Sequence, residues 1–328
     1  MTKKNTQKMI KKWRMKKTRK LSLIQKHSVN TQLSKMKRDK KMGGEAKKTT
    51  LNCAPKGNDF DENNFSCYAN STLQKLKTLW NNKSQIKISS NNPKDIWSQI
   101  KENFKGICDK ESCWISKLDG GEIGKKIIDS SFSPVRPKSW DKNKEEWLSD
   151  YDIEEVLNQY ETAYKCFYFF KPSPIDFCET DVGGSRKVSS EICDINLKDL
   201  ISKGKTKLGF VFNLDKHTGP GTHWVSLFVN VKKKWIFFFD SVGETAPKTV
   251  KSLVENIMKQ GIELGIKFKY DENHPKEHQY GNSACGLYSL YFILTMLKDT
   301  YSINYFKKGK ITDAQMQKYR KIYFNSSL

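Results

Sequence analysis

The sequence contains no apolar run long enough to cross a membrane, because its most hydrophobic stretch, residues 287–297, is far shorter than a membrane span. No apolar core follows the basic residues at the start of the chain, so we expect no secretory signal peptide. We therefore expect neither a transmembrane segment nor a secreted protein.

The eight cysteines lack the spacing of a metal site. None belongs to a Cys-x-x-Cys pair, and Cys108 and Cys113 have no matching pair of Cys or His ligands, so we expect no zinc site. Without a signal peptide, the thiols are expected to be reduced. A reduced state would leave a cysteine free to act as a nucleophile.

The positive charge of the chain is concentrated at one end. The formal net charge is +23, and residues 1–50 carry +16 of it, with 18 Lys or Arg against Asp39 and Glu45. This segment has few apolar side chains and cannot bury enough surface to offset its chain entropy, so we expect a disordered basic arm. The arm could bind nucleic acid or another polyanion, act as a nuclear address, lie on an anionic membrane, or be a solvated tail.

Residues 51–140 favour a separate helical arm domain. Apolar residues recur at helical spacing between Tyr68 and Asn81, and the same spacing returns in Ile96, Trp97, Ile100 and Phe104. A stretch that contains two prolines, residues 133–137, predicts a boundary. Residues 141–328 then form a domain of sufficient length for one catalytic core.

Three segments rich in Val, Ile, Phe and Trp predict strands, at residues 208–214, 223–230 and 234–240. Only a few residues join the last two, so we expect an antiparallel hairpin. With a two-residue loop at 231–232, His223 would lie directly opposite Asp240, with Cβ atoms about 5 Å apart. A loop at 232–233 would leave the two residues as diagonal neighbours.

A histidine and a carboxylate at that separation have the geometry of a catalytic base and its orienting acid. The carboxylate fixes the tautomer of the imidazole and leaves its other nitrogen free for a thiol. Alternatively, His223 simply ends a core strand and Asp240 caps one.

The run that follows Cys285 and Gly286 is apolar on nearly all faces, which predicts a buried helix with Cys285 in or near its first turn. A helix N-terminus lowers the pKa of a thiol and offers free N–H groups to an oxyanion. Gln279, on a polar loop six residues earlier, could supply a second oxyanion donor. Alternatively, Cys285 is a buried core cysteine and Gln279 an ordinary loop residue.

The order His223, Asp240, Gln279, Cys285 resembles that of the adenain and ubiquitin-like-protein (SUMO) protease superfamily. In that superfamily a Trp follows the catalytic His, the Gln lies six residues before the Cys, and a Gly follows the Cys. All three features are present here, in Trp224, Gln279 and Gly286.

A second stretch supports the resemblance. The segment from Trp147 to Ile153 is similar to a family segment that opens a helix, with Ser149 in place of the usual Asn and still able to cap the helix. In SUMO-type members, this Trp and the one after the catalytic His form a narrow tunnel for a Gly-Gly tail. The resemblance therefore implies substrate binding by Trp147 and Trp224, whereas the simpler interpretation is that both are core aromatics.

The resemblance implies an α+β fold, with a central mixed or antiparallel sheet between helices and an N-terminal helical arm. It also implies a cysteine protease that needs no metal or organic cofactor. The chain looks most similar to the virion-maturation proteases of large cytoplasmic DNA viruses, of the asfarvirus and poxvirus types, and to giant-virus thiol proteases of the mimivirus kind.

Such enzymes cleave structural polyproteins after Gly-Gly or Ala-Gly sequences. The expected substrates are therefore viral core polyproteins, and the expected locations are the virion core and the virus factory in the host cytoplasm. One alternative is an isopeptidase that removes SUMO or ubiquitin from host conjugates. An alternative of another class is a basic, nucleic-acid-binding virion-core protein with a vestigial protease fold.

Overall fold

The computed structural model describes residues 51–56, 63–181 and 183–328. The basic segment 1–50 lies outside the described residues, and so does the prediction that it is a disordered arm. Residues 49–328 form one compact unit.

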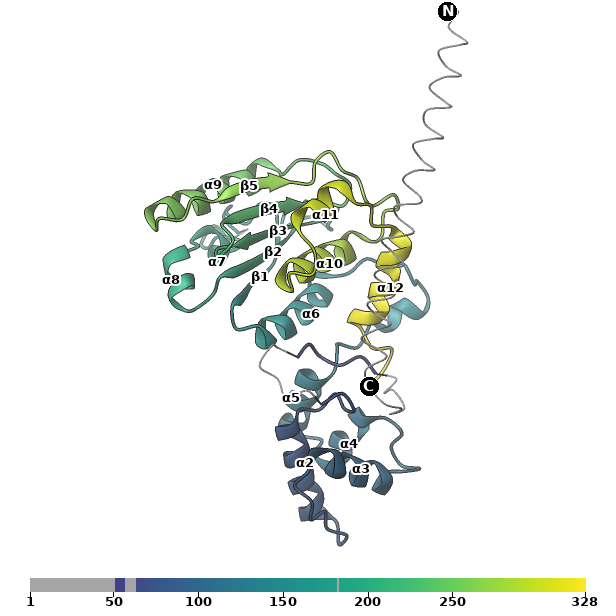
Figure 1. The fold of residues 1–328 in the computed structure, drawn as a ribbon. Coiled ribbons are helices and arrows are strands. Elements are labelled where there is room, and N and C mark those ends of the chain that lie inside the picture. Colours follow the sequence, from purple (N-terminus) through teal and green to yellow (C-terminus); the bar gives the residue numbers. More distant parts are fainter. Residues whose placement is uncertain (1–50, 57–62, 182) are drawn as a thin grey trace, which may run out of the picture. The chain divides into compact units, whose positions relative to one another are not determined.

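A five-stranded mixed sheet, with the strand order β1-β2-β3-β4-β5, forms the centre of the fold (Figure 1). The three middle strands are antiparallel, and each edge strand runs parallel to its neighbour. This confirms the expected α+β class. The strands are β1 (Phe167–Pro174), β2 (Lys207–Asn213), β3 (Trp224–Asn230), β4 (Trp235–Phe239) and β5 (Lys269–Glu272).

Helices cover both faces of the sheet, so every residue of β3 is buried. Trp224 and Phe228 belong to the hydrophobic cluster that includes α10, whereas Val225, Leu227 and Val229 belong to the cluster that includes α8 and α9. These helices are α6 (Asp150–Ala163), α7 (Ser190–Cys193), α8 (Leu197–Ser202), α9 (Lys248–Glu263), α10 (Cys285–Leu297), α11 (Ile303–Lys308) and α12 (Asp313–Tyr323).

Helix α10 is buried along its whole length, from Cys285 to Leu297, which confirms the predicted buried helix. It packs against β3, the middle strand of the sheet. Among the described residues, no helix is long and apolar enough to span a membrane.

The hairpin between β3 and β4 has a longer turn than the two-residue loop predicted at 231–232. Asn230 pairs with Trp235, so four residues form the turn, and Lys234 adopts a positive φ of 57° within it. The side chain of Asn230 accepts a hydrogen bond from the Lys233 backbone N–H, which stabilises this longer turn. The register with His223 directly opposite Asp240 is therefore wrong, and the diagonal arrangement is the one present.

Residues 63–131 form four α-helices, which pack around their own hydrophobic cluster. Leu73, Leu76, Ile96 and Ile100 are buried at the predicted helical spacing. The elements are α2 (Asn70–Lys83), α3 (Pro93–Asn103), α4 (Glu111–Leu118), α5 (Glu122–Ser131) and the short 3-10 helix η1 (Lys138–Asp141).

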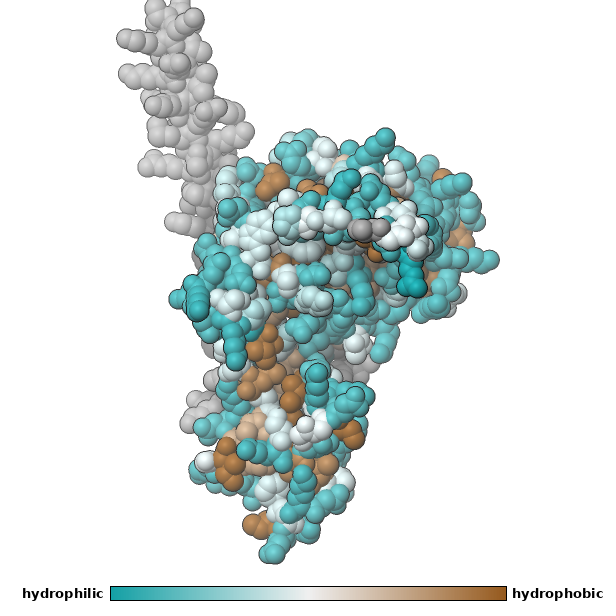
Figure 2. Space-filling model, turned by 180° about the vertical axis from the view of Figure 1, so that it is seen from behind, coloured by the Kyte–Doolittle hydropathy of each residue, from teal (hydrophilic) through white to brown (hydrophobic). Residues whose placement is uncertain are grey.

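Hydrogen bonds connect these helices with the catalytic part. The Gln159 amide of α6 donates to the Phe132 carbonyl, and the side chain of Asn325 accepts from the Asn52 backbone N–H. Both parts belong to one compact unit, so a domain boundary near residue 140 stays a prediction. Figure 2 shows hydrophobic side chains on the surface of the lower part of the molecule, which α2 to α5 form.

Six of the eight cysteines form disulfides, so the expectation that the thiols are reduced is wrong for these six. Each pair brings together residues close in sequence, with Cα–Cα distances of 5.0 to 5.7 Å. The bonds are Cys53–Cys67, Cys108–Cys113 and Cys178–Cys193. Two cysteines are free, Cys166 and Cys285, so the predicted nucleophile is not consumed in a disulfide.

Candidate active site

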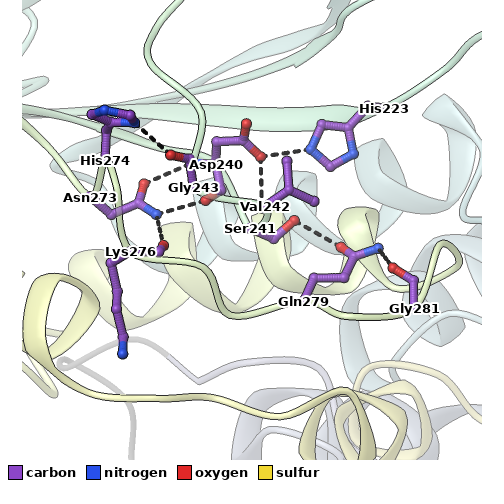
Figure 3. Close-up of polar contacts among 10 residues, drawn as sticks. All are labelled: His223, Asp240, Ser241, Val242, Gly243, Asn273, His274, Lys276, Gln279 and Gly281. Carbon is purple, nitrogen blue, oxygen red and sulfur yellow. Dashed lines mark hydrogen bonds and ion pairs between the residues drawn. The ribbon is translucent and has the colours of Figure 1, made fainter. Parts of the chain in front are cut away.

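The sheet brings His223 and Asp240 together at one end of the hairpin. His223 directly precedes β3, Asp240 directly follows β4, and the His223 Nε2 atom lies 2.7 Å from the Asp240 Oδ1 atom (Figure 3). Asp240 is only 1% exposed. A buried carboxylate that accepts a ring proton fixes the tautomer and orientation of the imidazole, which leaves Nδ1 for another partner.

Asn273 immobilises the backbone of Asp240. Its side-chain oxygen accepts from the Asp240 backbone N–H at 2.8 Å, and its amide nitrogen donates to the Asp240 carbonyl at 2.7 Å (Figure 3). This buried residue follows the short strand β5. Sequence reasoning missed it because an isolated Asn after a short strand has no pattern that separates it from an ordinary loop residue.

Cys285 is the first residue of α10, as predicted, and is 1% exposed. The preceding residue, Ala284, provides no side-chain cap, so no side-chain cap occupies the N–H groups of the first turn. The N–H groups of the first turn of α10 are therefore available to stabilise negative charge near Cys285.

Burial lowers the pKa of His223, but the hydrogen bond to Asp240 and the neighbouring Asp240 and Cys285 groups raise it overall, to about 9. This pKa places a positive charge on the His223 ring at neutral pH. Its raised pKa stabilises the folded protein fully below pH 6.5, and this contribution is lost as the pH rises through about 9.

Gln279 is also buried and lies on a segment without helix or strand. Its Oε1 atom accepts from the Ser241 hydroxyl at 2.8 Å, and its Nε2 atom donates to the Gly281 carbonyl at 2.7 Å (Figure 3). An amide nitrogen carries two protons, so one remains for an oxyanion. Ser241 follows Asp240 directly in sequence, a proximity that could have drawn attention to it.

Leu148 joins the two predicted substrate-binding tryptophans to the nucleophile. The Trp224 indole N–H donates to the Leu148 carbonyl at 2.9 Å. A Cβ atom added to Gly286 would lie 2.9 Å from the Leu148 Cβ atom, so only glycine fits at this contact. Leu148 therefore follows Trp147 in sequence, accepts the hydrogen bond of Trp224, and packs against Gly286, the residue after Cys285.

The two tryptophans differ in exposure. Trp224 is 7% exposed and belongs to the hydrophobic core, whereas Trp147 is 38% exposed at the surface. Ser149 caps α6 in a capping box with Asp152, as the sequence indicated for this position. A tunnel formed by both indoles stays a prediction, with Trp224 as its fixed wall.

Two cavities, of about 370 and 980 Å³, are lined by other parts of the chain and include none of the four candidate catalytic residues. Within the described ranges, no group of three or more His, Cys, Asp or Glu could hold a metal ion. The four candidate residues themselves supply a thiol, an imidazole, a carboxylate and an amide.

One protein-family model matches part of the chain. Residues 207–327 match the Ulp1 protease family, C-terminal catalytic domain. All four candidate catalytic residues lie inside this range.

Two curated relatives match most of the chain. "Putative thiol protease R355" of Acanthamoeba polyphaga mimivirus is 27% identical over 266 residues, which cover 75% of this chain and 84% of the relative. A cysteine protease of African swine fever virus is 27% identical over 242 residues, which cover 69% of this chain and 86% of the relative.

A solved structure shares the fold. The crystal structure of a protease from African swine fever virus matches with a TM-score of 0.60 and 23% sequence identity, over 84% of this chain and 97% of that chain. Residues 141–328 are little more than half of the chain, so the match extends into the helices that precede them.

Proposed function

We propose that the chain, a cysteine protease whose residues 207–327 match the Ulp1 catalytic domain, cleaves viral core polyproteins after small residues of the Gly-Gly type. The observation that carries this proposal is the near-complete burial of Cys285, at 1% exposed, beside the junction of Leu148 with Trp224 and Gly286. Only a narrow, extended segment of substrate can approach a sulfur in such surroundings.

In the proposed reaction, His223 holds the proton of Cys285, and the thiolate attacks the carbonyl carbon of the scissile peptide bond. The N–H of Cys285 and the free N–H of Gln279 stabilise the oxyanion. The imidazolium of His223 then protonates the leaving amine, and a thioester remains. Water attacks the thioester and releases the carboxylate product and the thiol. Each of these steps uses side chains of the chain itself.

Glycine specificity would arise by steric rejection. Trp224 cannot move away without losing its hydrogen bond to Leu148, and Trp147 lies next to Leu148 at the surface. If the two indoles close over an extended chain, side chains at the last two positions before the cut have no space.

The viral assignment is supported by the relatives, which come from a mimivirus and African swine fever virus. For such an enzyme, the virion core and the virus factory in the host cytoplasm are the places where the substrates would be met.

The test is hydrolysis of a peptide series in which the two residues before the scissile bond are varied. We expect cleavage after Gly-Gly and Ala-Gly, and a rate at least about tenfold lower for Leu or Phe at either position, because a clash at a narrow site costs more than about 1.4 kcal/mol. Efficient cleavage after Leu or Phe would contradict the small-residue proposal. The Cys285→Ala variant is the control for contaminating protease.

A second candidate function is removal of a ubiquitin-like modifier from conjugates. It is favoured by a relative from another isolate of African swine fever virus, which is named a SUMO-1 cysteine protease and is 26% identical over 242 residues. The same enzyme preparation should be offered SUMO and ubiquitin conjugates beside the core-polyprotein peptides. Faster turnover of a conjugate than of every peptide would replace the first proposal by this one.

The remaining alternative, a vestigial fold in a binding protein, is disfavoured by the site. The His223 Nε2 and Asp240 Oδ1 atoms are 2.7 Å apart, and Cys285 is a free cysteine at the start of α10. A protein without catalytic use for these residues has no reason to keep a partly buried His–Asp pair together with a free thiol.

A further inference from the structure

The segment that carries Gln279 is connected to the start of α12 by one carboxylate. The Oδ2 atom of Asp313 accepts from the backbone N–H groups of Tyr280 and Gly281, at 3.1 and 2.9 Å. Its Oδ1 atom accepts from the Tyr288 hydroxyl of α10 at 3.0 Å. Hydrogen bonds to a carboxylate are stronger than those to a neutral acceptor, and two consecutive N–H groups on one oxygen fix the intervening peptide plane.

Fixing Gly281 also fixes the orientation of the Gln279 amide. The Gly281 carbonyl can only accept, so it requires the nitrogen end of the amide, whose Nε2 atom lies 2.7 Å away. If the amide were flipped, two oxygen atoms would face each other at this distance. The Ser241 hydroxyl, on the other end of the amide, can donate or accept and would tolerate both orientations.

We propose that Asp313 is a positioning residue for the oxyanion site: it fixes the Tyr280–Gly281 peptide, and through the Gly281 carbonyl it directs the Gln279 N–H toward the oxyanion. The carboxylate itself contacts neither substrate nor Cys285. This inference rests on the proposed function, because it assigns a role within that reaction.

Asp313 is not required as the cap of α12. Thr312 is the N-cap, and its hydroxyl accepts from the Gln315 N–H in a capping box. The Tyr288 hydroxyl also has other acceptors, the carbonyls of His278 and Ile311 at 3.2 and 3.1 Å. Among the contacts of Asp313, the two N–H groups beside Gln279 are therefore the ones for which the structure offers no substitute.

The experiment compares Asp313→Ala and Asp313→Asn with the unchanged protein in two assays. The first is hydrolysis of a Gly-Gly peptide. We expect Asp313→Ala to lower kcat about 10- to 100-fold with little change in KM, somewhat less than direct loss of an oxyanion donor. Asp313→Asn should recover most of the loss, because its amide oxygen can still accept from both N–H groups.

The second assay is the rate at which iodoacetamide alkylates Cys285. Alkylation requires the thiolate but develops no oxyanion, so the rate and its pH profile should match the unchanged protein in both variants. A general loss of structure would change the rates of both peptide hydrolysis and alkylation. Thr312→Ala, which removes the neighbouring cap, is the matched control and should lower the melting temperature without lowering kcat.

A double substitution tests the route through Gln279. Adding Asp313→Ala to Gln279→Ala should cause no further loss of kcat, because the group that Asp313 positions is already absent. The inference is overturned if Asp313→Ala retains full kcat, if its loss is the same in both backgrounds, or if alkylation slows in parallel. Persistent hydrolysis by Cys285→Ala would instead overturn the proposed function.

Discussion

Two regions of the catalytic site are held in place by different interactions. His223 and Asp240 flank the paired strands β3 and β4, and Cys285 begins α10, so regular backbone hydrogen bonding positions these three residues. Gln279 lies between β5 and α10, on a segment with no helix or strand, and depends on hydrogen bonds from Ser241 and to Gly281.

The difference teaches that the nucleophile and the oxyanion donor can fail separately. The sheet and the helix are each supported by many buried contacts, so the His–Asp–Cys group should survive most single changes around it. The side-chain amide of Gln279 has one hydrogen bond at each end, so one substitution beside it can remove transition-state stabilisation and leave the thiol reactive.

The largest effect is expected from Cys285→Ala, which removes the proposed nucleophile and should lower kcat on the order of 10⁶-fold. The fold should remain, because α10 is buried over its whole length and one sulfur contributes little to it. Peptide hydrolysis and circular dichroism check both points. If a limiting alkylator first modifies Cys166, the other free cysteine, and activity is lost, the nucleophile has been assigned wrongly.

The second-largest effect distinguishes two roles of Asp240, the orientation of the His223 ring and the supply of a negative charge. His223→Ala should be nearly as damaging as loss of the nucleophile, whereas Asp240→Asn should be about 10²-fold milder. The Asn oxygen can still accept from the His223 Nε2 proton, at the position that Asn273 fixes. Equal losses of kcat/KM in the two variants would show that the carboxylate charge is essential.

The stability of the segment that carries Gln279 should depend on acid through His278, the residue before Gln279. This ring is fully buried, with Nε2 bonded to the Phe306 carbonyl and Nδ1 accepting from the Ile311 N–H. Burial lowers the pKa of His278 to about 4, so its neutral form stabilises the fold fully above pH 6.5 and loses this contribution as the pH falls through about 4.

At pH 5 this titration should reduce the free energy of unfolding by about 2 kcal/mol relative to pH 8. Urea unfolding at both values measures it, with His278→Gln as the control that cannot titrate. An identical pH dependence in the control would assign the acid sensitivity to other groups.

A smaller effect is expected at Gly286, where α10 packs against Leu148. An alanine would place its Cβ atom 2.9 Å from the Leu148 Cβ atom, so α10 or the segment of Trp147 must shift. We expect Gly286→Ala to lower the free energy of unfolding by about 1–3 kcal/mol and to reduce kcat. Gly120→Ala is the control, because its new Cβ meets nothing closer than 3.5 Å. Equal unfolding midpoints for both variants would show that the contact relaxes freely.

The smallest effect is expected from deletion of residues 1–50, which contain none of the four candidate catalytic residues. Hydrolysis of a short peptide should change less than about twofold, while the salt-sensitive part of DNA binding should be lost. A filter-binding titration at two salt concentrations measures that part. A truncated, folded protein without peptide hydrolysis would mean that this segment completes the active site.

The sequence predicted the strand-supported region well because its signals are local. Segments rich in Val, Ile, Phe and Trp indicated β3 and β4, and the apolar run after Cys285 indicated α10. The register with a two-residue loop at 231–232 was wrong. Nothing in the local sequence indicated the four-residue turn in which Lys234 adopts a positive φ. His223 and Asp240 still form their hydrogen bond, because the two side chains can reach each other from diagonal positions on the paired strands.

The support of Gln279 was not predictable in the same way. Its contacts with Ser241, and those of Gly281 with Asp313, join residues 38 and 32 positions apart. Such pairs are decided by how α12 and β4 pack in the folded chain, and a single polar residue in a loop has no periodicity. The disulfides were missed for a related reason. Reduced thiols were expected from the compartment, whereas disulfide pairing depends on which cysteines lie close together in the folded chain.

The position of Asp313 in the chain also orders events during synthesis. A ribosome releases the strands with His223 and Asp240 first, then Cys285, and Asp313 only after all of them. A nascent chain therefore exposes a complete base, acid and thiol before the carboxylate that orients Gln279 has left the exit tunnel. With Asp313 as the positioning residue proposed above, the growing chain should cleave peptides more slowly until α12 has been translated.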